Sequence, residues 1–418
     1  MRQGCGRGIR LGIVVAALCA IVMPASASAE PWVQHALGLQ YELASDMPLR
    51  NTPWVGTHNS FNSVAEMGPA LSPLDSNQKL PIVDQLRLGI RSVELDVHWF
   101  PSARTGGFAP VVCHATGEHG GCSVEKTLAE VLTEISGWLG ENPDQALLLY
   151  LEDHLDAQEG HDAAAGVLER ELGSAIYRPP AGGACAPTPL DLTRNQVRST
   201  GAQVLILSDC GSGTAWPAQV WSFADHVETR PRGYRDFPDC GPDFDRATYD
   251  NEMVRYFEDS TRVTAGGSVV GASTRDDGIT PATAAAMARC GVDLFGLDQL
   301  TVGDPRLDAL VWSWATGEPG SGDCAVQRAD ARWEASACGD SHPAACRAAD
   351  GSWRLTQGAE PWLNAAQACA SQSAVLAAPR TGYEGQLLRV AMEAAGATEA
   401  WLGLTRTGDS WRALDARG

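Results

Sequence analysis

The chain has 418 residues, of which 44% are hydrophobic, and its 51 acidic and 31 basic residues give a formal net charge of −20. This length predicts one large domain with a smaller one, and the hydrophobic fraction is sufficient for a packed core. The negative charge repels nucleic acid and gives no overall attraction to anionic membranes, so we expect no nucleic-acid partner and only local contacts with lipid.

Residues 1–29 have the pattern of a secretory signal peptide. Arginines precede the apolar run 11–23, and Ala27-Ser28-Ala29 offers a small-residue cleavage site. The run is shorter than the roughly 20 residues that span a bilayer, and an uncleaved anchor is the alternative. Cys5 and Cys19 lie in this segment, and the ten other cysteines are an even number that suits disulfides in an oxidising compartment. We therefore expect a secreted protein, either extracellular or periplasmic.

From residue 53 to about residue 314, apolar strand-like runs alternate with amphipathic segments, which predicts βα units around a parallel sheet. Ser123 is the predicted N-cap of the clearest helix. Polar residues close the strands, as is typical of a (β/α)₈ barrel with its site at the strand C-termini. Only six strands can be recognised, and 230–277 has no clear pattern. The six strands are 53–57, 91–97, 110–115, 146–152, 203–208 and 292–299.

Charged side chains alternate with apolar ones in the second strand, so that Glu94, Asp96 and His98 share one face. Two carboxylates that point into a barrel mouth are costly to keep ionised unless a cation or hydrogen bonds compensate them. Glu152 ends the strand 146–152, and the same alternation of side chains points it into the barrel mouth. Asn59 follows the first strand. The oxygen donors of Asn59, Glu94, Asp96 and Glu152 suit Ca²⁺, and less well Mg²⁺, better than zinc.

Two histidines occupy similar positions, His58 after the first strand and His114 at the end of the run 110–115. Beside a metal, two imidazoles can supply a base that takes a hydroxyl proton and an acid that protonates a leaving oxygen. Cys113 cannot share a proton with His114 because neighbouring strand residues point to opposite faces. We expect Cys113 to form a disulfide with Cys122.

These residues also have structural interpretations. The alternative for Glu94 and Asp96 is an ion pair with Arg87 or Arg91. The alternative for His58 is a core position at a strand end. The coincidence of these residues at successive strand ends favours a functional site.

The composition changes after the predicted barrel domain, which we expect to occupy residues 30–316. Residues 317–350 have the composition of a Gly/Pro-rich linker and a cysteine-rich segment. Residues 351–418 contain an alanine-rich helix that ends in Cys369. The partner of Cys369 is open between Cys324, Cys338 and Cys346.

The first part of the chain resembles the X-box catalytic region of phosphatidylinositol-specific phospholipases C of the calcium-dependent type. The matching pieces are Gly56-Thr57-His58-Asn59-Ser60, Glu94-Leu95-Asp96, Val112-Cys113-His114, Leu151-Glu152-Asp153-His154 and, more loosely, 291–299. The resemblance implies an α/β fold with a distorted (β/α)₈ TIM barrel whose Ca²⁺ is held by Asn59, Glu94, Asp96 and Glu152. The substrate-binding lysines and the arginine-tyrosine motif of that family are not recognisable here.

The resemblance also implies a reaction. The inositol 2-hydroxyl attacks the phosphorus of phosphatidylinositol, or of a related phospholipid at a membrane surface. His58 acts as base or stabilises the pentavalent centre, and His114 protonates the leaving oxygen of diacylglycerol. Asp298 and His98 are the candidate substrate-binding residues, His98 from a solvated rim position. We expect the protein to be a monomer.

Residues 351–418 resemble the first half of a C-type lectin-like domain, through Trp362-Leu363-Asn364 and Trp401-Leu402-Gly403-Leu404. This resemblance implies a small α+β segment with a contact to glycans. The nearest rival enzyme is a glycerophosphodiester phosphodiesterase, which is similar in its barrel and Glu-x-Asp pair but begins with His-Arg-Gly. A third interpretation is a lectin-like adhesion protein whose barrel is inactive.

Overall fold

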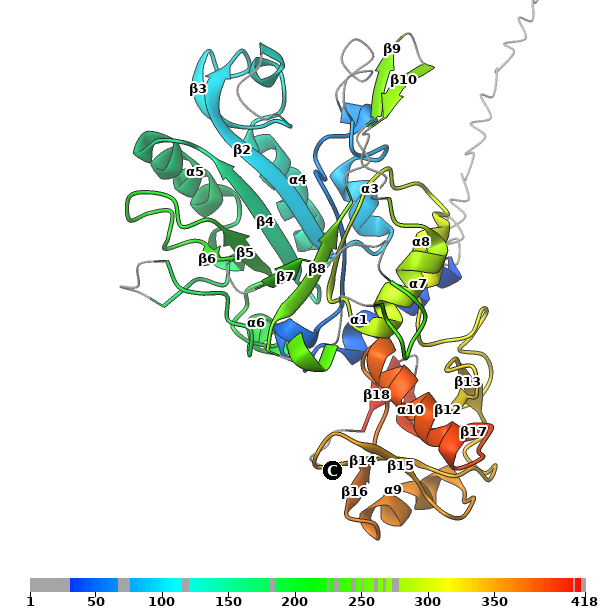
Figure 1. Cartoon of the computed structure of the whole chain (residues 1–418). Coiled ribbons are helices and arrows are strands. Elements are labelled where there is room, and N and C mark those ends of the chain that lie inside the picture. The colour runs from blue at the N-terminus through cyan, green and yellow to red at the C-terminus, as the bar shows by residue number, and fades with distance from the viewer. Residues whose placement is uncertain are drawn as a thin grey trace, which may run out of the picture. The chain divides into compact units, whose positions relative to one another are not determined.

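Eight parallel strands form a barrel (Figure 1): β1 (Trp54–Thr57), β2 (Ser92–Ser102), β4 (Leu147–His154), β5 (Val204–Ser208), β6 (Trp221–Ser222), β7 (His226–Glu228), β8 (Met253–Phe257) and β11 (Leu294–Leu297). Their hydrogen-bonded order is β6-β5-β4-β2-β1-β11-β8-β7, so the chain visits them in the order in which they lie around the barrel. As far as the described residues show, the ladder is open between β6 and β7. The strand order confirms the predicted distorted (β/α)₈ barrel.

This computed structural model describes residues 31–66, 76–114, 120–180, 185–223, 226–228, 234–241, 246–249, 251–258, 262–265, 268–272, 278–408 and 410–414. The expected signal peptide lies outside these ranges. None of the helices within them is both long and apolar enough to cross a membrane.

The strands separate two hydrophobic cores, because successive side chains point to opposite faces. Outward side chains such as Leu95 and Leu149 pack against helices, and inward ones such as Leu148 and Leu205 fill the barrel. The helices of this part are α1 (Trp32–Leu43), α3 (Ile82–Arg87), α4 (Leu128–Glu141), α5 (Gln158–Glu171), α6 (Arg194–Ser199), α7 (Pro281–Cys290) and α8 (Pro305–Leu310). Between β5 and β8 the described ranges contain no α-helix, and this is where the ladder opens.

One predicted barrel strand is wrong. The run 110–115 contributes to β3 (Gly107–Val112), which pairs antiparallel with β2 from Val97↔Val112 to Ser102↔Gly107. β2 therefore continues beyond the barrel as one arm of a hairpin, and β3 is its return arm (Figure 1). The sequence could not distinguish the two cases, because an apolar run looks the same in a parallel or an antiparallel strand.

Three barrel strands were missed, namely β6, β7 and β8. β6 has two residues and β7 has three, which is too short for a period-two pattern. β8 carries Arg255 on its inward face, so it interrupts the apolar run that marked the other strands. A further hairpin, β9 (Arg262–Ala265) with β10 (Ser268–Ala272), follows β8.

The helix predicted to begin at Ser123 begins later. α4 is capped by Thr127, whose hydroxyl accepts from Glu130 N at 3.3 Å while Glu130 Oε2 accepts from Thr127 N at 2.8 Å. This reciprocal capping box satisfies two backbone donors, whereas Ser123 lies in a preceding 3₁₀ turn. The apolar residues of this helix recur at helical spacing and are buried, namely Leu128, Val131, Leu132, Ile135 and Leu139.

The C-terminal region contains two antiparallel sheets and two helices. The first sheet has the order β13 (Trp333–Ser336), β12 (Cys324–Arg328), β17 (Glu399–Thr407) and β18 (Ser410–Ala413). The second has the order β15 (Trp353–Leu355), β14 (Ala345–Ala348) and β16 (Ala374–Leu376), with helices α9 (Trp362–Ala370) and α10 (Gly382–Ala394). Because β12 pairs with β17, the segments 317–350 and 351–418 share a sheet.

Five disulfides pair every cysteine after residue 30. They are Cys113–Cys122, as predicted, and Cys185–Cys210, Cys240–Cys290, Cys324–Cys338 and Cys346–Cys369. Cys346 is thus the partner of Cys369. Such a set of disulfides indicates an extracellular or periplasmic protein.

Candidate active site

The carboxyl ends of β1, β2, β4 and β11 bring most of the predicted residues together. Glu94, Asp96 and His98 are each only 3% exposed and lie on the inward face of β2, as the alternation predicts. Asp96 is in register with Glu152 on β4. His58 follows β1, which is hydrogen-bonded to both β2 and β11. Residues far apart in the sequence therefore meet at one mouth.

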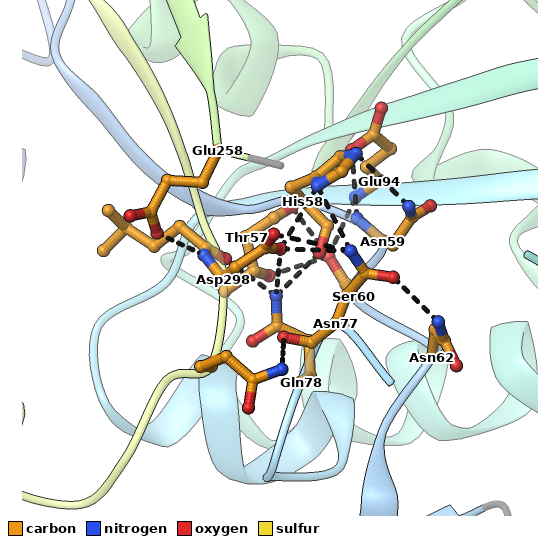
Figure 2. Close-up of polar contacts among 12 residues, drawn as sticks. Thr57, His58, Asn59, Ser60, Asn62, Asn77, Gln78, Glu94, Glu258 and Asp298 are labelled. Carbon is orange, nitrogen blue, oxygen red and sulfur yellow. Dashed lines mark hydrogen bonds and ion pairs between the residues drawn. The ribbon is translucent and has the colours of Figure 1, made fainter. Parts of the chain in front are cut away.

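His58 is held from one side by a buried carboxylate (Figure 2). Its Nδ1 lies 3.1 Å from Oδ1 of Asp298, which is fully buried. Its Nε2 lies 3.2 Å from the side chain of Asn59 and 3.9 Å from Glu94 Oε2. Burial opposes a charge on this imidazole, but Asp298 and Glu94 outweigh it and raise the pKa of His58 to about 10. His58 thus bridges Asp298 and the carboxylates of β2.

Amides from the loop before α3 complete the support for His58. Gln78 Nε2 donates to His58 O at 2.6 Å and to Leu297 O at 2.7 Å, and Asn77 Nδ2 donates to Asp298 Oδ2 at 3.4 Å. Asn77 Oδ1 accepts from Asn62 Nδ2 at 2.7 Å. Sequence analysis missed these residues, because polar side chains in a loop show no periodic pattern.

The carboxylates of β2 repel one another. Burial, and then the negative charges of Glu94 and Glu152, raise the pKa of Asp96 well above its usual value. With its amide oriented by its neighbours, Asn59 donates to the two Asp96 oxygens at 2.7 and 2.9 Å and accepts from His58 Nε2 at 3.2 Å. The backbone N–H of Asn59 donates to Glu94 Oε2 at 3.0 Å. A cation here would relieve this repulsion.

The arginines of the alternative interpretation have other partners. Arg87 pairs with Asp84 at 2.8 Å, and Arg91 donates to Gln145 Oε1 at 2.7 Å and to two carbonyl oxygens. The four predicted ligands offer the oxygen donors that a hard cation takes. Within the described ranges, no three His, Cys, Asp or Glu side chains already converge as a metal site. In donor type and charge alone, the four residues suit a hard cation such as Ca²⁺.

Two stacked imidazoles extend the site along β2. The rings of His98 and His154 are 4.5 Å apart at 18°, and His154 Nε2 lies 3.1 Å from Glu152 Oε1. Burial and the charge of His154 lower the pKa of His98 to about 4. His98 Nε2 is buried without a hydrogen-bond partner among the described residues. The expected rim position of His98 is wrong, because β2 continues past it and His154 covers it.

The β2–β3 hairpin returns His114 to the mouth. His114 follows β3 by two residues, and the neighbouring Cys113 N donates to Asp96 O at 3.1 Å. The pKa of Glu152 is lowered first by the hydrogen bond from His154, and the charges of His58 and His114 add to this effect. The charges of both histidines thus reach the carboxylate of Glu152.

An arginine and an aromatic ring on β8 were not predicted. Arg255 and Phe257 share the inward face, and the Arg255 guanidinium carbon lies 4.5 Å from the ring centre of Phe223 and 5.1 Å from that of Phe257. Nε and Nη1 of Arg255 have no hydrogen-bond partner in the ranges described above. Phe257 also stacks on His58, with ring centres 6.1 Å apart. The alternation of Met253, Arg255 and Phe257 could have revealed this face.

Comparison with known proteins gives consistent matches. The family model described as "Rv2075c PI-PLC-like domain" matches residues 16–304. Two uncharacterised proteins of Mycobacterium tuberculosis are each 40% identical over 392 residues, which are 89% of this chain and 80% of theirs. A PI-PLC X domain-containing protein of Arabidopsis thaliana is 25% identical over 121 residues, 28% of this chain and 27% of that protein.

Solved structures of phospholipases C align more distantly. The phosphatidylinositol-specific enzyme from Listeria monocytogenes has a TM-score of 0.41 at 15% identity, covering 66% of this chain and 97% of its own. A calcium-dependent phosphoinositol-specific phospholipase C from a Pseudomonas species has a TM-score of 0.32 at 14% identity. The alignment covers 53% of this chain and 80% of that enzyme. From the family model and the mycobacterial relatives, we conclude that this chain belongs to the Rv2075c PI-PLC-like family.

Proposed function

We propose that the chain is a secreted, calcium-dependent phospholipase C that cleaves phosphatidylinositol to diacylglycerol and a cyclic inositol phosphate. Membership of a PI-PLC-like family supports a phosphodiesterase of the phospholipase C class. The observation that carries the proposal is His58, held by Asp298 at Nδ1 while its Nε2 faces Asn59 and the carboxylates of β2. Such an imidazole can exchange a proton with a hydroxyl or bond to a phosphoryl oxygen.

The two histidines have separate roles in this proposal. Asp298 fixes the orientation of His58. The carboxylates that raise the pKa of His58 favour its protonated form, which would stabilise the charge of the pentavalent phosphorus. A bound cation would offset these carboxylates, and the Nε2 of a neutral His58 would then take the proton of the inositol 2-hydroxyl. His114, brought to the Glu152 side of the mouth by β3, protonates the oxygen of the leaving diacylglycerol. Water can then open the cyclic product.

Asn59, Glu94, Asp96 and Glu152 would hold the calcium ion. When bound, it would lower the pKa of the attacking hydroxyl and neutralise phosphoryl charge. Binding would replace the hydrogen bonds that Asn59 donates to Asp96 and that His154 donates to Glu152. The raised pKa of Asp96 supports this assignment, because the site carries more negative charge than its described neighbours compensate.

Arg255 is the candidate for contacts with the phosphate or with inositol hydroxyls. Its buried Nε and Nη1 are donors without partners in the described structure, and aromatic rings of Phe223, Phe257 and Tyr150 surround it. Polyphosphoinositides need clustered positive charge, whereas this mouth is acidic. Unphosphorylated phosphatidylinositol is therefore the better match. The partnerless Nε2 of His98 can accept from a further hydroxyl.

Exposed apolar side chains near the mouth support a membrane-bound substrate. Phe108, on the β2–β3 hairpin, is 60% exposed, and Val302, after β11, is 78% exposed. Both follow the carboxyl ends of barrel strands, where the site lies. Exposed apolar side chains at this end of the barrel could insert into a lipid surface.

Product analysis on phosphatidylinositol vesicles, with and without free Ca²⁺, tests the proposal. We expect calcium-dependent release of diacylglycerol and cyclic inositol phosphate. Consumption of glycerophosphoinositol instead would indicate the glycerophosphodiester phosphodiesterase alternative. Turnover that His58→Ala and His114→Ala leave unchanged, or no turnover at all, would contradict the proposed mechanism. The glycan contact of the C-terminal region stays a prediction, which binding to immobilised glycans would test.

A further inference from the structure

A buried ion pair contacts Asp298, the residue that holds His58. Glu258 follows β8 and is only 2% exposed, and its Oε2 accepts from Arg306 Nη1 at 2.6 Å. Arg306 lies in the first turn of α8 and also donates from Nη2 to Asp304 Oδ2 at 2.7 Å. Asp304 is the N-cap of that helix. The pair thus connects the ends of β8 and β11 with the start of α8.

This ion pair fixes the backbone of Asp298 on both sides. The Asp298 N–H donates to Glu258 Oε2 at 2.6 Å, and the Asp298 carbonyl accepts from Arg306 Nη2 at 2.7 Å. Figure 2 shows Glu258 and Asp298 in contact on the side of His58 away from Asn62. The next residue, Gln299, has a φ of 54°, a left-handed conformation that residues other than glycine rarely adopt. The chain therefore turns sharply directly after Asp298, and the ion pair holds that turn.

We propose that Glu258 and Arg306 are positioning residues for His58, because they fix the Asp298 backbone and Asp298 fixes the imidazole. This inference deepens the proposed function and rests on it. Both side chains are already bonded within the protein, since Glu258 also accepts from Ile279 N, and Arg306 is shared between Glu258, Asp298 and Asp304. Their effect on the reaction is therefore indirect. A displacement of about 1 Å in a reacting group can cost about 100-fold in rate.

The other end of the same two strands offers a matched control. Arg246 Nη1 lies 2.9 Å from Asp293 Oδ2, and that oxygen also accepts from Val254 N of β8 at 2.9 Å. This pair is as buried as the pair of Glu258 and Arg306, with side chains 7% and 5% exposed. Asp293 precedes β11, whereas Asp298 follows it. Both pairs tie β8 to β11, but only one of them touches Asp298.

Kinetics of the full chain on phosphatidylinositol test the inference. We expect Glu258→Gln, and the double variant with Arg306→Met that removes both charges of this pair, to lower kcat about 10- to 100-fold with KM within about 2-fold. Arg246→Met should lower the unfolding temperature and leave kcat unchanged. In an Asp298→Ala background, Glu258→Gln should change kcat by less than about 2-fold, since coupled residues are not additive.

A spectroscopic readout makes the test independent of substrate. In chain labelled with ¹⁵N-histidine, the ring signals of His58 are assigned by their loss in His58→Ala. Glu258→Gln should shift them, and Arg246→Met should not. Unmoved signals, equal shifts in both variants, or an undiminished loss of kcat in the Asp298→Ala background would overturn the inference. Wild-type protein that is inactive on phosphatidylinositol but shows the expected shifts would refute the proposed function while supporting the positioning role.

Discussion

Removal of the exposed apolar side chains at the mouth should weaken binding to lipid. Complete burial of a large apolar side chain is worth about 1.5–3 kcal/mol. Phe108 is 60% exposed and Val302 is 78% exposed, so insertion of each into a bilayer adds about 1–2 kcal/mol. Because about 1.4 kcal/mol is a tenfold change in affinity, Phe108→Ser and Val302→Ser should each weaken vesicle binding about 5- to 30-fold.

Sedimentation with phosphatidylinositol-containing vesicles measures this effect, and cleavage of a short-chain, water-soluble phosphatidylinositol serves as the companion assay. The serine variants should keep their rate on the soluble substrate, because neither residue touches His58 or the carboxylates of β2. Leu363→Ser is the matched control, since Leu363 is 80% exposed but lies on α9 of the C-terminal region. Equal losses for Leu363→Ser and Phe108→Ser, or unchanged vesicle binding in both mouth variants, would refute the reasoning.

Three further predictions concern the metal, the acid and a helix cap. EGTA should abolish turnover and calcium should restore it, and calorimetry should detect calcium binding that Asp96→Asn weakens; chelator-resistant activity would leave the carboxylates a structural role only. His114→Ala should lower kcat about 10²- to 10⁴-fold, because a general acid contributes this much, whereas the surface control His35→Ala should retain the wild-type rate. If His114→Ala is as active as wild type, the leaving oxygen has another proton donor. Thr127→Ala should lower the free energy of unfolding in urea by about 1 kcal/mol through loss of the capping box, and Thr133→Ala on the same helix should have a smaller effect. Equal effects of the two threonine substitutions would show that the cap is unimportant for stability.

Local patterns made much of the site predictable. The alternation along β2 correctly placed Glu94, Asp96 and His98 on the inward face, because strand side chains alternate whatever the strand pairs with. The same alternation placed Glu152 on β4, whereas His58, Asn59 and Asp298 were predicted from their positions at the ends of strands. Arg255 was missed because β8 is short and has a charged residue at its centre. Glu258 and Arg306 were missed because no local pattern links residues that meet only when β8, β11 and α8 pack together.

The sequence by itself determined the short-range features: the inward and outward faces of the strands, the buried face of α4, and the disulfide between Cys113 and Cys122. Each depends on residues close together in the chain, where backbone geometry alone fixes their relation. Only the tertiary structure decided that β3 turns back along β2 and brings His114 to the mouth, and that Cys346 is the partner of Cys369. It also placed Asp298 against His58, 240 residues earlier in the chain. Such contacts depend on which strands become neighbours, and that choice is made by the packing of the two cores as a whole.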